Sequence, residues 1–268
     1  MRALKQLAKM TNLQEPETTK TTITQQQWNK LTQRKYAQTY EALLRFQGKT
    51  WKPPHIKPET RLPFIPTETE IDQLIASMGK RTATILQTLK ETGIRISEAV
   101  KLKWIDLSTE QKTLNITPAK GSNPRILHIS NKLIDMLNQL PKIRETIFPT
   151  NIDTLRANFS EQRKTTAQKL QNPRLRRISF HTFRHWKGTM EYHKTKDIIH
   201  VKNVLGHKNI ENTMIYINIE QALFLTENDE FNHLVVHNEQ ELTKAIDENW
   251  TLVIAVNNSY PMYFKKRK

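Results

Sequence analysis

Residues 180–190 read FHTFRHWKGTM, and helical periodicity extends from about residue 182 to 193. Two further helical segments are expected downstream, over about 197–205 and 210–219. The second of them overlaps the stretch VLGHKNIENTMIYI, residues 204–217. This region therefore predicts a C-terminal half built from packed helices, with its chemically active side chains concentrated on three of them.

The side chains in and near these helices share one kind of chemistry. His181, Arg184, His207 and Tyr216 lie within 36 residues, and Arg95 lies far upstream in ETGIRISEAV. Together they provide guanidinium and imidazole donors and a phenol, with no carboxylate pair and no cysteine. Cationic donors combined with a phenol suit a phosphodiester that is attacked by the protein itself.

Each of these residues has a plain structural alternative. His181 and Arg184 at this spacing could be a buried histidine beside a surface arginine, and Tyr216, among isoleucines, could be a core tyrosine. If Tyr216 is the nucleophile, nearby cations should favour its phenolate. His181 and His185 have the i, i+4 spacing of helical zinc ligands, but no glutamate lies between them and Arg184 would repel a dication. We therefore expect neither a metal nor a cofactor.

A basic hairpin precedes these helices. Segments 114–117 and 125–129 read as strands joined by a turn rich in proline and glycine, with Lys120 at its tip. A lysine in this position is usually only solvated. It could alternatively reach into a groove and protonate a leaving alkoxide.

The composition favours a polyanionic partner. The 268 residues include 42 Lys and Arg against 26 Asp and Glu, which gives a net charge of +16. Nucleic acid is the first candidate, and a basic protein without a specific anion is the alternative. No segment has the length of a membrane-spanning helix, no secretory signal is evident, and cysteine is absent. We therefore expect a cytoplasmic protein without a membrane partner.

The chain is expected to be α+β and mainly helical, with two domains. Residues 1–60 form a small helical domain whose second helix runs from about 25 to 46, and a proline-rich linker, residues 53–66, leads out of it. Residues 61–268 form a larger domain with a small hairpin, and they end in an α/β appendage at about 230–268.

Local signals set the helix boundaries in the larger domain. Thr67 and Glu70 have capping-box spacing, and Gly93 is a plausible stop for a helix over about 83–92. Ser97 is expected to cap the short helix that follows.

Four ordered blocks resemble the catalytic domain of the tyrosine recombinases, the phage-integrase and Xer-type family, and are most similar to archaeal members. The resemblance covers about Thr67 to Phe224, and the four blocks read ETGIRISEAVKLKWIDL, TPAKGSNPRILHIS, FHTFRHWKGTM and VLGHKNIENTMIYI. Each block alone is weak evidence for the resemblance, but four blocks in this order and spacing are strong evidence. The resemblance implies that residues 1–60 are a SAM-like core-binding domain, apparently shortened at its start, and that 61–268 are the catalytic domain.

The resemblance also assigns the cationic residues. Arg95 and Arg184 would clamp the scissile phosphate. His181 would accept a proton or bind the phosphate, and His207 would hydrogen-bond the transition state.

The remaining site positions follow in the same way. Tyr216 would be the nucleophile, leaving a 3′-phosphotyrosine, and Lys120 would protonate the departing 5′ oxygen. Glu98 would support the site, and His185 would be structural.

The implied partner is double-stranded DNA, bound by a homo-oligomer that is a dimer or tetramer. Basic side chains expected on its phosphates are Arg125, Arg174, Arg176 and Arg177, the last three in a segment, residues 174–177, that is expected to be a loop. The implied function is site-specific recombination or integration. A DNA-binding protein that has lost recombination and a type IB topoisomerase remain alternatives, and the residues do not separate an integrase from a chromosome-dimer resolvase.

Overall fold

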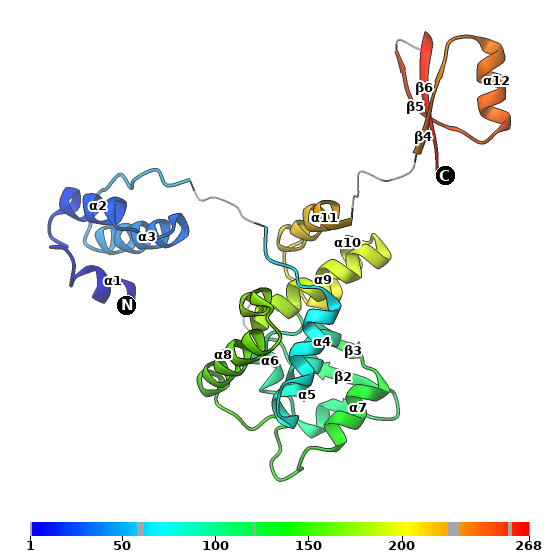
Figure 1. Ribbon diagram of the computed structural model, residues 1–268. Helices are drawn as coiled ribbons and strands as arrows, with labels where there is room; N and C mark the ends of the chain where they lie inside the picture. The colour runs from blue at the N-terminus through cyan, green and yellow to red at the C-terminus, as the bar shows by residue number, and fades with distance from the viewer. Residues whose placement is uncertain (1, 58–61, 120–121, 225–230, 257–258, 268) are drawn as a thin grey trace. The chain divides into compact units, whose positions relative to one another are not determined.

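The computed structural model describes residues 2–57, 62–119, 122–224, 231–256 and 259–267. The chain divides into two compact units, Met1–Leu62 and Pro63–Lys268, which are described separately. The expectation of a mainly helical chain with small sheets is confirmed (Figure 1). No helix in the described ranges is both long enough and apolar enough to span a bilayer.

The N-terminal unit is a three-helix cluster of α1 (Arg2–Leu7), α2 (Pro16–Gln25) and α3 (Lys30–Phe46). The expected second helix starts later than predicted, because the Asn29 side chain accepts a hydrogen bond from the Thr32 amide at 2.7 Å and caps α3 there. The three helices enclose a small apolar core, which consists of Leu7, Ile23, Tyr36, Ala37, Tyr40 and Leu44.

The larger unit is built mainly from helices around a three-stranded sheet of order β1-β2-β3 (Figure 1). Its helices are α4 (Glu68–Ala76), α5 (Lys80–Thr92), α6 (Ile96–Ala99), α7 (Asn131–Asn138), α8 (Ile152–Lys169), α9 (Phe180–Thr195), α10 (Ile198–Leu205) and α11 (Glu211–Phe224). The antiparallel strands are β1 (Leu107–Ser108), β2 (Thr113–Ile116) and β3 (Arg125–His128). Two 3₁₀ helices are η1 (Trp104–Asp106) and η2 (Pro173–Arg177).

Two predicted helix boundaries are confirmed by their hydrogen bonds. Thr67 and Glu70 form a reciprocal capping box at the start of α4. Gly93 ends α5 with a left-handed φ of 63°, and a Cβ at this position would lie 2.8 Å from Leu205 Cδ2. Glycine is therefore required here both for the backbone conformation and for the close approach of α10.

Two local expectations are wrong. Ser97 does not cap α6, because Arg95 holds the N-cap position and its backbone N–H donates to the Glu98 carboxylate at 3.0 Å. The basic segment 174–177 is not a loop but part of the 3₁₀ helix η2, whose first turn is closed by the Asn172 side chain accepting from the Arg174 amide at 3.0 Å.

Helix α9 is the central element of the larger unit. It packs against α5, α10 and α11. Phe183 on α9 and Leu86 and Leu89 on α5 are fully buried in the same core. Burial of each such side chain stabilises the fold by about 1.5–3 kcal/mol. The core thus fixes the helix that carries His181 and Arg184.

The C-terminal appendage is a small α/β unit, as predicted. Its strands are β4 (Phe231–Val236), β5 (Thr251–Val256) and β6 (Ser259–Arg267), in the order β4-β6-β5, and α12 (Glu239–Asp247) packs beside β4. Val236, Ala245 and Phe264 form its buried core.

Candidate active site

Arg184 is held at the centre of the larger unit. Its side chain is only 2% exposed, and its Nη1 and Nη2 donate to the backbone oxygens of Gly93 at 2.8 Å and Leu205 at 2.7 Å. Burial, with a smaller contribution from the nearby charge of Arg95, lowers the pKa of Arg184 to about 10. The guanidinium therefore stays charged at neutral pH and joins the ends of α5 and α10.

Arg95 follows the turn that Gly93 makes after α5. Its Nη1 lies 3.5 Å from Glu98 Oε1, and its side chain remains 28% exposed. This leaves guanidinium donors of Arg95 open to an incoming anion, whereas Arg184 is largely enclosed.

Glu98 is a buried carboxylate in the same cluster. It accepts hydrogen bonds from Arg125 Nη2 at 2.8 Å and from the Ala119 amide at 3.3 Å. Burial alone would raise the pKa of Glu98, but the bonds from Arg125 and from the Arg95 and Ala119 backbones lower it to about 2. Glu98 is therefore ionised and supports Arg95.

Arg125 was expected to contact DNA phosphates at the surface, but its side chain lies within the protein. Its side chain is 6% exposed, and Nε donates to Val204 O at 3.0 Å while Nη1 donates to Ser122 Oγ at 3.1 Å. With Nη2 bound to Glu98, each guanidinium nitrogen is engaged. A Cβ on Gly206, whose φ is 68°, would lie 2.6 Å from Arg125 Nη1.

The β2–β3 loop reaches this cluster. Lys120 lies outside the described residues, so its expected position at the site stays a prediction. The segment that follows is anchored, because the Asn123 amide and Ser122 Oγ donate to Gly206 O at 3.0 and 3.1 Å. These bonds hold the base of the loop against the turn that carries His207.

His207 is buried beside the arginines. It is 8% exposed, and its Nδ1 lies 2.9 Å from Thr213 Oγ1. Burial and the charges of Arg184 and Arg95 lower the pKa of His207 to about 3. The imidazole is therefore neutral at pH 7. Thr213 was not identified from the sequence, because a threonine six residues after a histidine matches no motif.

Tyr216 faces the same cluster from α11. Its ring is 2% exposed and lies parallel to His207 at a centroid distance of 6.5 Å, and its hydroxyl lies 3.5 Å from His185 Nδ1. A Cβ on Gly188 of α9 would lie 2.5 Å from Tyr216 Cζ, so the ring packs directly on that glycine. The sequence did not single out Gly188, although a glycine inside a helix is a recognisable sign of close packing.

At Tyr216, burial opposes the effect that was expected from the nearby cations. The nearby cations Arg184 and Arg95 do lower its pKa, but burial has the larger effect and raises the pKa to about 12. The phenol is therefore protonated at neutral pH.

His181 and His185 stack edge to face at 4.6 Å near the start of α9. Desolvation and the charges of Arg184 and Arg95 lower the pKa of His181, and burial lowers that of His185 to about 4. Among the described residues, no cluster of three or more His, Asp or Glu side chains could hold a metal ion.

The other basic residues expected on DNA lie around η2. Arg174 donates to both carboxylate oxygens of Glu70, at 2.7 and 3.3 Å. The guanidinium groups of Arg174 and Arg177 lie over the Phe64 ring, at 4.9 and 4.3 Å from its centroid. Arg176 is exposed. Arg174 is thus partly committed to the protein through its bonds to Glu70.

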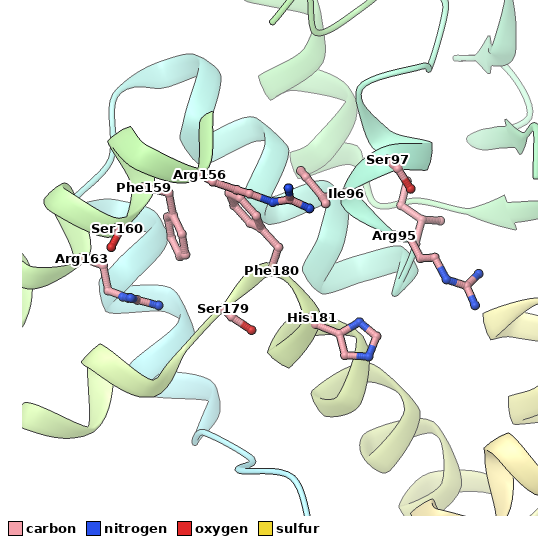
Figure 2. A pocket seen from close by; sticks show the side chains of 11 residues that line it. Arg95, Ile96, Ser97, Arg156, Phe159, Ser160, Arg163, Ser179, Phe180 and His181 are labelled. Atoms are coloured by element: carbon pink, nitrogen blue, oxygen red, sulfur yellow. The ribbon is translucent and has the colours of Figure 1, made fainter. Parts of the chain in front are cut away.

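A cavity of about 450 Å³ adjoins this cluster and includes Arg95 and His181 in its lining. In Figure 2, Arg163 of α8 lies on one side of Phe180, and His181 and Arg95 lie on the other. The α8 residues were not identified from the sequence, because no motif marks them.

The arrangement has one chemical capability that stands out. Two arginines, two neutral imidazoles and a phenol converge from α9, from α11 and from the turns that follow α5 and α10, and a buried carboxylate holds one arginine. Such a set can bind an anion with preorganised donors beside a potential nucleophile.

Comparisons with known proteins show the family of this chain. The sequence profile of the phage integrase family matches residues 66–222. The tyrosine recombinase XerD of Listeria innocua is 28% identical over 202 residues, covering 66% of each chain, and the tyrosine recombinase XerA of Pyrococcus horikoshii is 26% identical over 171 residues, covering 59% of this chain and 58% of its own. Bacterial and archaeal relatives are thus comparably similar, and the expected greater similarity to archaeal members is not confirmed.

The fold is also found in a solved structure. The Tn1549 transposon integrase in complex with transposon right end DNA superposes with a TM-score of 0.65 at 14% identity, covering 84% of this chain and 92% of that one. The chain spans less than two thirds of the length of curated relatives such as a putative integrase/recombinase of Sinorhizobium fredii, of which it covers 58%.

Proposed function

The chain belongs to the phage integrase family, and from this membership we propose that it cleaves and rejoins DNA at specific sites through a 3′-phosphotyrosyl intermediate. One observation carries the proposal: Tyr216 is packed in the same cluster as Arg184, His185 and His207, with Arg95 beside it. A DNA-binding module would gain nothing from enclosing a tyrosine among these donors.

The reaction is a transesterification. The Tyr216 oxygen attacks the scissile phosphorus, the bond from phosphorus to the 5′ oxygen breaks, and the 3′ phosphate stays on the tyrosine. The phenol is protonated at neutral pH because its pKa is about 12, so it has to lose its proton during the attack. His185 Nδ1, 3.5 Å away and neutral, is placed to receive that proton, a role that the resemblance gave to His181. Lys120 supplies a proton to the departing 5′ oxygen in this proposal.

Negative charge grows on the non-bridging oxygens as the bond forms. Arg95 presents exposed donors to these oxygens, and the enclosed Arg184 adds a fixed positive charge. His207 and His181 are the neutral donors nearby. In a well-studied enzyme, loss of one such preorganised donor costs about 2.7–4 kcal/mol of transition-state stabilisation.

The ester bond to Tyr216 retains the energy of the original phosphodiester. A 5′ hydroxyl can therefore attack the phosphotyrosine and restore a DNA strand without a nucleotide or other cofactor. Because Tyr216 is 2% exposed, the attack also requires α11 or the lining of the site to shift when DNA binds.

We infer that the chain binds double-stranded DNA through its net charge of +16, that residues 1–60 contribute to this binding, and that it acts as a homo-oligomer in the cytoplasm. Arg176 and Arg177, which extend from η2, are candidate phosphate contacts.

A covalent trapping experiment tests the proposed function. Nicked duplexes tiled across the DNA that flanks the coding sequence are incubated with the protein and resolved on a denaturing gel. Wild type should form a protein–DNA adduct, and Tyr216→Phe should form none. Salt-sensitive DNA binding without any adduct would instead support a binding protein that has lost recombination. Relaxation of a supercoiled plasmid that lacks the mapped site would support a topoisomerase.

A further inference from the structure

The cavity beside the active site is formed by three segments of the larger unit. They are the turn from Ile94 to Ser97, one face of α8 and the start of α9. Its volume of about 450 Å³ falls within the range of about 300–1,000 Å³ usual for ligand sites. Because Arg95 and His181 line it, the cavity is continuous with the place proposed for the scissile phosphate.

The lining carries positive charge without a carboxylate. Arg95, Arg156 and Arg163 all line it, and none of the lining residues is acidic. Arg156 bonds to Asp153 at 3.1 Å, but both side chains are largely exposed, and a surface pair of this kind holds its arginine only weakly. Arg156 can therefore turn toward an anion.

Arg163 adds an unused donor. Its Nη1 donates to Ile178 O, whereas its Nε is buried and has no hydrogen-bond partner among the described residues. A buried donor without a partner is costly, and an anion in the cavity would provide one. None of the chemistry proposed for Tyr216 uses this group.

The floor of the cavity is apolar. Phe159 of α8 and Phe180 of α9 stack at a centroid distance of 4.5 Å, and the Arg163 guanidinium lies 5.5 Å from the Phe159 ring centre. Figure 2 shows Phe180 between Arg163 and His181, with Phe159 on the Arg163 side. A cationic site with an apolar floor strengthens charge–charge attraction, because less water screens it.

We propose that this cavity binds a second phosphate of the same DNA strand, adjacent to the scissile phosphate, through Arg156 and Arg163. The inference rests on the proposed function, since it takes Arg95 as the shared boundary between the two phosphates. Occupancy of the second position would fix the register of the strand, so that the scissile phosphate lies against Tyr216 and not one nucleotide away.

A small nucleotide tests the cavity without knowledge of the target sequence. Thymidine 3′,5′-bisphosphate and thymidine 5′-monophosphate are titrated into the full chain by calorimetry at low salt. The bisphosphate, which can place one phosphate at Arg95 and the other in the cavity, should bind wild type about tenfold more tightly than the monophosphate. Arg156→Gln should remove most of this advantage.

Arg144→Gln is the matched control. Arg144 is an exposed arginine between α7 and α8 that does not line the cavity, so its loss lowers the net charge equally and should preserve the advantage. Three results would each overturn the cavity proposal. Wild type could bind the two nucleotides equally, Arg156→Gln could keep the full preference for the bisphosphate, or Arg144→Gln could lose as much of that preference as Arg156→Gln. If wild type forms the DNA adduct but shows no bisphosphate advantage, only this inference fails. If the advantage depends on Arg156 but no adduct forms, only the proposed function fails.

Discussion

Arg125 Nη2 and Glu98 Oε2 form a fully enclosed ion pair at 2.8 Å, with side-chain exposures of 6% and 0%. The pair links three parts of the site, because Glu98 also receives the Arg95 amide and Arg125 also donates to Val204 O. Arg125 therefore acts through its neighbours and is a positioning residue.

Replacing Arg125 with Met should destabilise the protein strongly. Breaking a buried pair from one side leaves Glu98 uncompensated and costs about 3–5 kcal/mol. Urea unfolding measures the loss, and Arg144→Met, at an exposed arginine, should change stability by no more than about 0.5 kcal/mol.

DNA binding separates this role from a phosphate contact. In Arg125→Met, under conditions where the variant is folded, the slope of log affinity against log salt should equal that of wild type. A slope smaller by about 0.9 would mean that Arg125 neutralises a DNA phosphate directly. Adduct formation at saturating DNA should fall, because Arg95 and the His207 turn lose their support.

Gly188→Ala should disturb the packing of α11 on α9. The added methyl would lie 2.5 Å from Tyr216 Cζ, 2.7 Å from Cε1 and 2.8 Å from Cε2, so the ring has to move. Overpacking of this kind costs about 1–3 kcal/mol. Thermal unfolding measures it, with Gly79→Ala as the control because a Cβ there meets nothing within 4 Å. Equal melting temperatures of the two variants would contradict the packing described for Tyr216.

Tyr216→Phe should leave the fold almost unchanged while it removes the adduct. Among the described residues, the hydroxyl makes one long contact of 3.5 Å, to His185, so its loss should alter the free energy of unfolding by less than about 1 kcal/mol. Chemical unfolding of the variant checks this. A large loss of stability would mean that a missing adduct reflects misfolding, and the trapping experiment would then need another nucleophile variant.

Acid should destabilise the protein through His207. Its pKa is about 3 in the folded state and 6.5 in the unfolded chain, so the unfolded chain takes up the proton first as pH falls. The stability that depends on a neutral His207 is fully present above pH 6.5 and is lost progressively as the pH falls toward 3. Between pH 7 and pH 5 the loss from this group is about 2 kcal/mol.

Urea unfolding at pH 7 and pH 5 measures this loss. His207→Asn should lose correspondingly less stability over the interval than wild type. His128→Asn, at an exposed histidine on β3, should behave like wild type. An identical pH dependence in His207→Asn and wild type would show that His207 is not buried in its neutral form.

Much of the local structure was predictable because its signals lie close together in sequence. Thr67 and Glu70 cap α4 by direct reciprocal bonds, and Gly93 ends α5 because it tolerates a positive φ. Ser97 shows where such reasoning fails: the N-terminus of α6 is capped by Glu98, whose carboxylate is fixed by Arg125, 27 residues away. A short helix is decided by such distant partners more than by its own residues.

The sequence by itself determined the helical plan, the family and the residue types brought to the site, because periodicity, caps and ordered motifs are properties of the chain. Tertiary structure decided what those residues experience. Burial outweighs nearby charge at Tyr216 and keeps its phenol protonated, and Arg125 is enclosed where a surface role was expected. Arg163 and Arg95 line the same cavity because Phe159 of α8 stacks on Phe180 of α9. The burial of a side chain and its contacts with distant segments depend on the folded structure. A sequence pattern does not contain them.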